Sequence, residues 1–512
     1  MKRFPHRTRR RTDTFTGTRT SSSRYAVFLL CSMLFGLRVT AQVPEECYRI
    51  ETLEPPPGIS PAVTALAFDS EGRLLSAFRR GSIWSLDTST GAWQPFANGL
   101  LWPLGMVCGA PGEVFVVQTP ELTRVVDTDR DGTADLYETI CDLWGISGNY
   151  HEFAYGPVRD ADGNFFVGLG LASAGGPTRE PLRGRPPPIQ PPDKPRGHHS
   201  PVPYRGWIVK ISPTGTMTPF ASGFRQPNGL VFNPTGDLFS VDNQGDWKGT
   251  SPLYHITEGG FYGHPASLVW SENSPVDPAA ISAETVAKQS RPAAVEFPQN
   301  DMAGSTAQPV LDTTGGKFGP YAGQLIVADW THPRLYRVSL EKLDGEYQGA
   351  CYPFIENGGL TRGNLRLAFA PDGSLYVGQC SLPWFDAPEG LKRVVWTGKT
   401  PMDILRMSLR ADGFELTFTK PLAPSGATIA QNYSLQHYFY RSTREYGSPR
   451  HESTPVPIER VEVLDDGLRV RLFVGSIAVD RIYDLRTRGL HGTDGEPLVT
   501  SMAAYTVRRL RR

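Results

Sequence analysis

One pattern of apolar and polar positions recurs along the chain between residues 63 and 380. An apolar segment leads into a short turn that carries Gly, and a second apolar segment follows the turn. Each segment either alternates between apolar and polar residues or is apolar throughout, as half-buried and buried strands are. The Gly supplies the positive φ that a tight hairpin requires. The copies read "VTALAFDSEGRLLSAF" from 63, "PLGMVCGAPGEVFVVQ" from 103, "HEFAYGPVRDADGNFFVGLG" from 151, "NGLVFNPTGDLFSVDN" from 228, "FGPYAGQLIVADW" from 318 and "LRLAFAPDGSLYVGQC" from 365.

Six copies of one hairpin indicate a β-propeller, in which each blade is a small antiparallel sheet of the same design. A third strand-like segment follows several copies, at residues 81–87, 122–127, 251–256, 333–340 and 390–396. We therefore predict an all-β chain with a six-bladed β-propeller over residues 42–400. The segment "CYRIETLEP" from residue 47 is expected to complete the last blade and close the ring. A pair of β-sandwiches is the alternative, but sandwiches do not repeat one phrase six times.

The pattern changes after residue 403. Clean alternating segments with Asp-Gly turns follow, among them "ILRMSLRADGFELTFTKPL", "IERVEVLDDGLRVRLFV" and "RIYDLRTRGL". They predict a small Ig-like β-sandwich over residues 404–508. Modules of this kind serve as accessory or spacer domains. The histidines of this region are scattered along the sequence and do not indicate a catalytic site.

Two long insertions interrupt the propeller pattern. Residues 171–204 are dense in Pro and Gly, and residues 266–313 are mostly polar and carry no blade phrase. Long loops in compact domains are usually functional or disordered, and in a propeller they would lie over one face. His198 and His199 in the first insertion are a conceivable metal-binding pair, but we expect them to be a solvated loop pair.

The first 41 residues read as a signal peptide. A basic segment precedes the thirteen-residue apolar core "YAVFLLCSMLFGL", and small residues follow it, so cleavage is expected before Gln42. Thirteen apolar residues are too few to span a bilayer comfortably. We therefore predict an exported protein, periplasmic or extracellular, with no transmembrane span in its mature form.

Removal of this leader changes the charge balance of the chain. The whole chain has 52 basic and 52 acidic residues, whereas residues 42–512 have 43 basic and 51 acidic ones. This mildly acidic composition argues against a nucleic-acid partner. Five cysteines remain, and in an oxidising compartment Cys108 could pair with Cys141 and Cys351 with Cys380, although the sequence does not fix connectivity.

An acidic segment, "VVDTDRDGTADLYET" from residue 125, matches the calcium-loop pattern D-x-[DN]-x-[DN]-G-x5-E. Like charges this close repel unless something neutralises them. Strand-like residues precede the loop and no capped helix follows it, so we expect a structural calcium site in a hairpin rather than an EF-hand pair. A solvated acidic turn is the alternative. The expected oxygen ligands are Asp127, Asp129, Asp131, the carbonyl of Thr133, Asp135 and Glu138.

Three segments place polar side chains where the inner strands of a propeller face the axial channel. His151 precedes one inner strand and is suited to be a general base, because its pKa lies near ambient pH. Arg225 holds the same position in the next blade, and Arg362 and Arg366 hold it in the last one. A guanidinium suits a carboxylate or a developing oxyanion. Each residue alone also has a purely structural explanation, as a buried histidine or an inter-blade clamp.

These residues also carry a resemblance. "HEFAYGP", "ASGFRQPNGLVFNPTGDLF", "GGFYGHP", "GGKFGPYAGQLIVADW" and "LRLAFAPDGSLYVG" resemble the glucose/sorbosone dehydrogenase family, six-bladed propellers that include soluble quinoprotein aldose dehydrogenases. The resemblance covers roughly residues 55–395. When the aspartate loop and the Ig-like tail are considered as well, the chain is similar to the bacterial proteins called putative membrane-bound dehydrogenases.

The resemblance implies pyrroloquinoline quinone (PQQ) and calcium in the channel, and a sugar as substrate. It makes His151 the base that takes a proton from the sugar hydroxyl while hydride passes to the quinone, and Arg225 the residue that polarises the quinone oxygen. The implied cofactor-binding residues are Asn243, Gly245, Lys317 and Arg366. A separate electron acceptor, such as a cytochrome or a quinone, is then required.

The chain departs from the family pattern at two places. Thr314 stands where the family has a lysine for a PQQ carboxylate, and Lys317 only follows the paired glycines. The segment "DNQGDW" lacks the proline of the family motif. These departures favour an alternative, a non-catalytic, calcium-stabilised propeller that binds glycans or protein partners. A calcium-dependent lactonase is a third candidate, but Asp242 and Asn243 alone supply too few channel ligands for it.

Overall fold

The computed structural model describes residues 43–176, 182–189, 197–272, 275–382, 385–464 and 466–511. The predicted signal peptide and parts of the first insertion lie outside these residues. Within them, no helix is long and apolar enough to cross a membrane.

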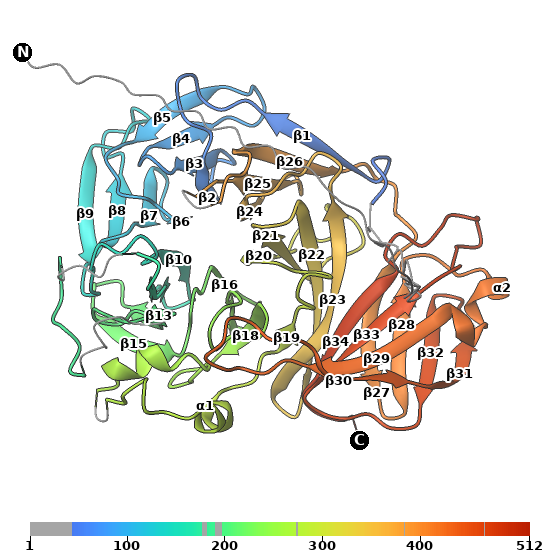
Figure 1. Ribbon diagram of the computed structural model, residues 1–512. Helices are drawn as coiled ribbons and strands as arrows, with labels where there is room; N and C mark the ends of the chain where they lie inside the picture. Colours follow the sequence, from blue (N-terminus) through green and yellow to red (C-terminus); the bar gives the residue numbers. More distant parts are fainter. Residues whose placement is uncertain are drawn as a thin grey trace, which may run out of the picture. The chain divides into compact units, whose positions relative to one another are not determined.

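Across the described residues, six antiparallel blades of four strands each correspond to the six copies of the repeated hairpin (Figure 1). Five blades are separate sheets, and the fifth blade is part of an eight-stranded sheet. The first three blades comprise β2 (Val63–Phe68), β3 (Leu74–Phe78), β4 (Ile83–Leu86) and β5 (Trp93–Ala97); β6 (Gly105–Cys108), β7 (Glu113–Val117), β8 (Leu122–Val126) and β9 (Leu136–Cys141); and β10 (Ala154–Arg159), β11 (Phe165–Leu169), β14 (Trp207–Ile211) and β15 (Met217–Ser222).

The next three blades continue the same order. They comprise β16 (Gly229–Phe232), β17 (Leu238–Val241), β18 (Pro252–Ile256) and β19 (Val295–Glu296); β20 (Thr306–Leu311), β21 (Leu325–Asp329), β22 (Arg334–Leu343) and β23 (Glu346–Glu356); and β24 (Asn364–Phe369), β25 (Leu375–Gln379), β26 (Gly390–Trp396) and β1 (Tyr48–Leu53). The prediction of a six-bladed propeller is confirmed.

The ring closes through β1 at the start of the described chain. This strand pairs antiparallel with β26 along its whole length, from Tyr48 opposite Trp396 to Leu53 opposite Leu391. Each inner strand also packs against the inner strand of the next blade, and β2 packs against β24. The sixth blade is therefore built from both ends of the propeller sequence, as the segment "CYRIETLEP" predicted.

Arg366 of β24 lies on the propeller axis and is fully buried. Its Nε donates to the carbonyls of Thr64 (3.1 Å) and Leu104 (2.9 Å), and its Nη1 donates to the carbonyl of Asn228 (3.1 Å). The guanidinium carbon lies 5.6 Å from the ring centre of Tyr155. One cation thus joins the inner strand of the last blade to the first, second, third and fourth blades.

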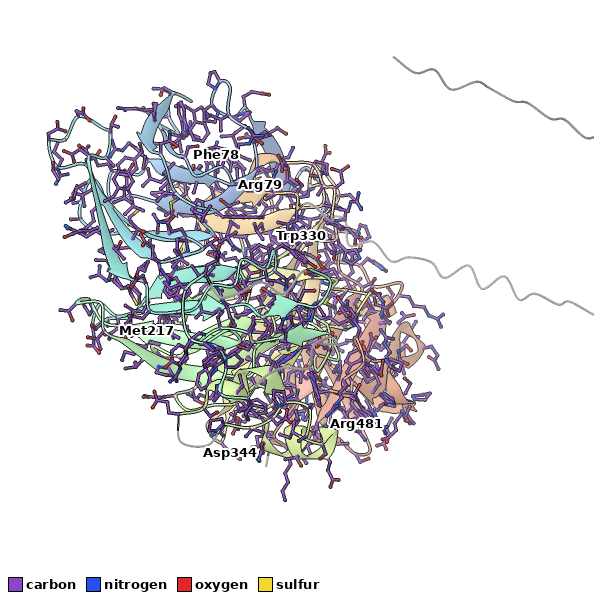
Figure 2. All side chains as sticks on the ribbon, turned by 60° about the vertical axis from the view of Figure 1, so that its left-hand side comes forward. Phe78, Arg79, Met217, Trp330, Asp344 and Arg481 are labelled. Carbon is purple, nitrogen blue, oxygen red and sulfur yellow. The ribbon has the colours of Figure 1, made fainter. Side chains whose placement is uncertain are left out.

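The C-terminal region forms two sheets around a second hydrophobic core, and Figure 2 places Arg481 within it. One sheet contains β27 (Ile404–Arg410), β28 (Gly413–Phe418), β32 (Arg469–Val474) and β31 (Ile458–Val463); the other contains β34 (Met502–Val507), β33 (Arg481–Thr487), β29 (Tyr433–Phe439) and β30 (His451–Val456). The second sheet is continuous with the fifth blade, because β34 pairs with β23. The assignment of this region as an Ig-like module stays a prediction.

The remaining elements are short and belong to the insertions and the C-terminal region. They are β12 (Ala172–Ser173), β13 (His198–His199), η1 (Pro265–Trp270), α1 (Ala283–Gln289), α2 (Pro424–Ala427) and η2 (Ala430–Asn432). The suggested disulfides are wrong for this structure. The thiols of Cys47, Cys108, Cys141, Cys351 and Cys380 are all free.

Replacement of Arg366 tests the role of the axial guanidinium. Arg366→Met leaves several buried carbonyls without a donor, so we expect the free energy of unfolding to fall by about 3 kcal/mol or more. Urea unfolding measures this loss. Arg49→Met is the control, because the Arg49 side chain is 61% exposed and forms a surface ion pair with Glu51. A loss below about 1 kcal/mol is expected there. Equal losses in the two variants would contradict the axial role.

Candidate functional site

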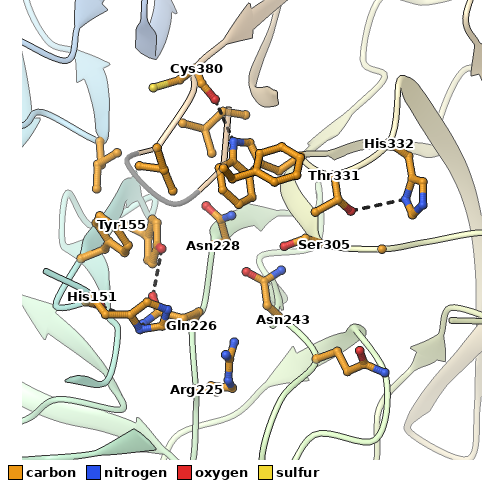
Figure 3. Close-up of a pocket in the computed structure, with 18 of the residues that line it drawn as sticks. His151, Tyr155, Arg225, Gln226, Asn228, Asn243, Ser305, Thr331, His332 and Cys380 are labelled. Carbon is orange, nitrogen blue, oxygen red and sulfur yellow. Dashed lines mark hydrogen bonds between the residues drawn. The ribbon is translucent and has the colours of Figure 1, made fainter. Parts of the chain in front are cut away.

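A cavity of about 460 Å³ lies at one end of the propeller axis, lined by loops of several blades (Figure 3). Its wall combines aromatic rings with amide, hydroxyl and imidazole groups, a composition typical of sites for small polar molecules. The described lining residues are Trp102, Leu104, His151, Phe153, Tyr155, Arg225, Gln226, Asn228, Asn243, Gln244, Gln299, Asn300, Gly304, Ser305, Trp330, Thr331, His332, Leu365, Cys380, Leu382, Phe385 and Tyr446.

His151 stands in the turn before β10, and its backbone N–H donates to Asn149 Oδ1 (3.0 Å). Its Nδ1 lies 3.0 Å from the carbonyl of Leu171, which accepts hydrogen bonds. The amide of Gln226 also lies 2.7 Å from Nδ1. Its two hydrogens, however, go to the carbonyls of His151 (2.9 Å) and Leu171 (3.0 Å). Figure 3 shows Gln226 accepting from Tyr155 on its other side (2.9 Å).

The imidazole of His151 is held in its neutral form. Burial lowers its pKa well below the ordinary value, and the neighbouring His198 and Arg225 lower it further. A neutral imidazole is the form in which histidine accepts a proton. The imidazole of His151 is therefore uncharged at neutral pH.

Arg225 follows β15 and is tied into a charged network beside His151. Its Nη2 lies 3.1 Å from His198 Nε2, and its Nε lies 3.6 Å from Asp246 Oδ1. Asp246 is also bound by His198 Nδ1 (2.5 Å) and by His264 Nε2 (3.3 Å). Although burial alone would raise the pKa of Asp246, hydrogen bonds from the two histidines hold it well below the ordinary value. The carboxylate is thus ionised and balances the positive charge of the guanidinium.

The backbone that carries Arg225 is anchored by a second buried carboxylate, Asp242. Asp242 accepts from the backbone N–H groups of Arg225 (2.9 Å), Gln226 (2.6 Å) and Asn243 (2.9 Å). Lys248 lies 3.1 Å from the same carboxylate and is almost fully buried. Burial lowers the pKa of Lys248, and Asp242 opposes this effect. Asp242 therefore orders the wall segment rather than facing the cavity.

The expectation that His198 and His199 form a solvated loop pair is wrong. The His198 side chain is only 8% exposed, and His199 is buried. Burial lowers the pKa of both rings to about 4. Among the described residues, neither ring nitrogen of His199 has a hydrogen-bond partner. The insertion folds back as β13 against β12, which brings His198 to Asp246.

The predicted cofactor-binding residues divide into two groups. Asn243 lines the cavity, and Gly245 lies under Arg225, where a Cβ would stand 1.9 Å from the arginine Nε. Lys317 instead donates to the carbonyl of Pro371 (3.0 Å), outside the described cavity wall. Arg366 lies deeper on the axis and lines a smaller cavity of about 30 Å³. The structure thus brings His151, Arg225 and Asn243 together and leaves Lys317 and Arg366 out.

Several wall residues have no counterpart in the sequence-based prediction. Gln226 follows Arg225 directly in the segment "GFRQPNGL". The same pattern that places Arg225 before the inner strand β16 would therefore also have predicted Gln226 as a wall residue. His332 Nδ1 donates to Asp329 (3.2 Å), and Trp330 donates to the carbonyl of Cys380 (2.8 Å). Tyr446 comes from the C-terminal region, and no local pattern in that region points to the cavity.

The aspartate loop lies in the second blade, between β8 and β9. Oxygen atoms of Asp127, Asp129 and Asp131 all lie within 4.8 Å of one another. Two backbone N–H groups, those of Gly132 (2.9 Å) and Asp131 (3.2 Å), donate to Asp127.

The other expected ligands of this loop have partners within the chain. Asp135 accepts from the backbone and hydroxyl of Thr128 (2.9 and 2.5 Å), and Glu138 pairs with Arg124 across the strands (2.6 Å). The Thr133 backbone N–H donates to Asp131 (2.8 Å). The structure therefore gathers three carboxylates and directs the remaining two carboxylates elsewhere.

Comparisons with known proteins find similarity in structure alone. No family profile and no curated sequence matches the chain. Similar solved structures include an oxidoreductase of Thermus thermophilus assigned as a glucose dehydrogenase (19% identity, 68% of this chain and 100% of that one, TM-score 0.48). They also include the PQQ-bound aldose sugar dehydrogenase of Streptomyces coelicolor (17%, 69% and 99%, TM-score 0.43) and the PQQ domain of pyranose dehydrogenase from Coprinopsis cinerea (13%, 68% and 95%, TM-score 0.47).

The buried, unpaired ring of His199 predicts a pH-dependent stability. Below its ordinary pKa of 6.5 the unfolded chain takes up a proton that the folded chain binds only near pH 4. Stability therefore falls as the pH is lowered from 6.5 to 4, by up to about 3 kcal/mol for this one residue. His199→Leu should flatten the dependence and raise stability at pH 8, since it removes an unpaired polar group.

His199→Gln is the matched control for this experiment. It removes the titrating group but keeps a buried polar side chain, so we expect the flatter pH dependence without the gain at pH 8. Urea unfolding at several pH values measures both quantities. An unchanged pH dependence in both variants would show that His199 is not buried in a neutral form.

Proposed function

We propose that the chain binds a sugar in the axial cavity and oxidises one of its CH–OH groups, with His151 as the base. One observation carries this proposal: the imidazole of His151, which burial keeps neutral, stands in the wall of a polar and aromatic cavity, beside the guanidinium of Arg225. Oxidation of an alcohol requires removal of the proton from the hydroxyl oxygen and of a hydride from the carbon that carries this hydroxyl. A neutral histidine is suited to the first of these steps.

In this proposal His151 Nε2 accepts the hydroxyl proton of the bound sugar. The contacts of its Nδ1 with the carbonyl of Leu171 and the amide of Gln226 keep the ring oriented during the transfer. Of the charged groups near the ring, the ionised Asp246 favours the imidazolium that forms, whereas Arg225 disfavours it and so promotes the later release of the proton. Amide and hydroxyl groups of the wall, such as Asn228, have the donors and acceptors that sugar hydroxyls require.

PQQ would supply the hydride-accepting quinone, and the cavity residues fit it in part. Arg225 is the one arginine among the described wall residues, and with Asn243 it would hold an anionic or carbonyl oxygen of the cofactor. Gly245 leaves the space that the guanidinium occupies. Since Lys317 and Arg366 lie elsewhere, a cofactor with three carboxylates would meet fewer cations than the sequence resemblance implies.

A second candidate function follows from this shortage of cations. A propeller that binds glycans without oxidising them needs the aromatic and amide wall but no cofactor. The placement of Lys317 and Arg366 outside the cavity favours this candidate over a quinoprotein.

In either case we propose that the protein is exported and acts outside the cytoplasm, as the first 41 residues suggest. A dehydrogenase would then pass its electrons to a separate acceptor. We also propose that Asp127, Asp129 and Asp131 bind a structural Ca²⁺ distinct from the cavity, because carboxylates at this separation repel without a cation.

Replacement of His151 tests the catalytic proposal. His151→Gln should lower kcat for dye-linked sugar oxidation by about 10²- to 10⁴-fold, because the amide cannot accept the proton. Sugar affinity, measured by calorimetry, should change by less than about fivefold. His332→Gln is the control, since it removes another histidine of the same wall. Full activity in His151→Gln would overturn the mechanism.

Calorimetric titration of PQQ into metal-stripped protein, with and without Ca²⁺, separates the two candidate functions. Binding of PQQ supports the dehydrogenase and justifies a screen of aldoses. Sugar binding without any PQQ binding supports the binding module.

Calcium should stabilise the second blade through the aspartate loop. We expect saturating Ca²⁺ to raise Tm in the wild-type protein and to leave Tm unchanged in Asp129→Asn/Asp131→Asn, which removes two of the three converging charges. Asp344→Asn, in a turn of the fifth blade, is the matched control and should keep the calcium response. A full response in the loop variant would place the calcium elsewhere.

A further inference from the structure

The C-terminal region contributes one residue to the cavity wall. Tyr446 lies in the segment 440–450, which joins β29 to β30, and it lines the cavity together with the propeller loops. Its side chain is nevertheless 69% exposed, so most of the ring has no protein neighbour. Large exposed aromatic rings at a cavity mouth suit a ligand that presents an apolar face.

The segment that carries Tyr446 is fixed to the propeller by backbone hydrogen bonds. Trp247 N–H donates to the carbonyl of Thr443 (2.6 Å), Gly447 N–H to that of Gly245 (2.9 Å), and Ser448 N–H to that of Gly249 (3.1 Å). Together with the bridge between Asp246 and Tyr446, these bonds align the two segments side by side.

Close backbone packing supports the same contact. A Cβ on Gly249 would lie 2.8 Å from the carbonyl oxygen of Arg441, so the approach requires glycine. Arg444 donates to the carbonyls of Ala279 (2.6 Å) and Ile281 (3.1 Å) in the second insertion. The pairing of β34 with β23 ties the rest of the C-terminal region to the fifth blade. Tyr446 therefore stands at a fixed place beside the cavity.

A chain of contacts relates Tyr446 to the proposed base. The rings of His151 and His198 are 4.7 Å apart, His198 Nε2 lies 3.1 Å from Arg225 Nη2, and the Arg225 guanidinium carbon lies 5.4 Å from the centre of the Tyr446 ring. The Arg225 guanidinium thus contacts the Tyr446 ring, and the rest of the ring faces solvent. Tyr446 is thus separated from His151 by the width of two side chains.

We propose that Tyr446 is a ligand-contacting residue that packs against the second sugar unit of an oligosaccharide whose first unit lies at His151. This inference rests on the proposed sugar-binding function and makes it more specific. The C–H faces of a sugar ring are apolar and its rim is polar, which matches a tyrosine ring with a hydroxyl at its edge. A single sugar unit at His151 would not extend past Arg225 to Tyr446. The substrate class is therefore a disaccharide or longer glycan rather than a free monosaccharide.

The test compares monosaccharides with disaccharides made from them. Dissociation constants of glucose, galactose, cellobiose, maltose and lactose are measured by calorimetry on the wild-type protein and on Tyr446→Ala, Tyr446→Phe and Tyr137→Ala. In Tyr446→Ala we expect at least one disaccharide to lose about tenfold in affinity, the loss of one ring contact, and the monosaccharides to change less than about twofold. Tyr446→Phe should restore most of the disaccharide affinity.

Tyr137→Ala controls for the loss of an exposed tyrosine. Tyr137 lies on β9, is 44% exposed and is not part of the described cavity wall, so its removal should leave every affinity unchanged. Equal loss for monosaccharides and disaccharides in Tyr446→Ala, or no loss, would overturn the inference while the sugar-binding function stands. If the wild-type protein binds none of the five sugars, the proposed function and this inference both fail.

Discussion

The burial of a single positive charge on the propeller axis constrains the rest of the structure. Arg366 has no carboxylate partner among the described residues, so its charge is compensated by carbonyl and amide oxygens of several blades. Burial lowers its pKa to about 10, and the side chain still stays charged at neutral pH. Such compensation works only if the inner strands bring their carbonyl groups within hydrogen-bonding distance of the guanidinium. The arrangement of the blades and the position of Arg366 therefore depend on each other.

The same cation separates the two ends of the axis. It donates to the backbone of Leu104 and Asn228, both of which also line the large cavity, while Arg366 itself lines the small cavity beyond. The axial space is therefore a pocket with a floor rather than an open channel. Above this floor a second cation, Arg225, is paired with Asp246, so the pocket wall carries little net charge. This balance suits a neutral polyol more than a multiply charged anion.

The repeated hairpins could be predicted from the sequence because each depends on residues close in the chain. Alternating strands and a turn glycine suffice to define a blade, and the leading segment that closes the ring has the same pattern. The site could be predicted only where a residue stands next to an inner strand, as His151 and Arg225 do. The link between His198 and Asp246 joins residues 48 positions apart through an insertion rich in Pro and Gly, where no periodic pattern exists. The resemblance indicates the place of Lys317 in the sequence but not the direction of its side chain, which bonds the carbonyl of Pro371 outside the described cavity wall.

Sheet continuity explains why the C-terminal region cannot be a loose spacer in this structure. The strands β22 and β23 extend well beyond the length of the other propeller strands, and the last strand of the chain, β34, pairs with the extension of β23. A spacer would need a flexible linker, whereas here the backbone hydrogen bonds of the fifth blade run directly into the second core. Glycines at 245 and 249 then admit the arginine side chain and the C-terminal segment at distances that any Cβ would prevent. The pairing of β34 with β23 and the close contacts at Gly245 and Gly249 therefore determine where Tyr446 stands beside the cavity. The shape of the cavity opening depends on both the propeller and the C-terminal region.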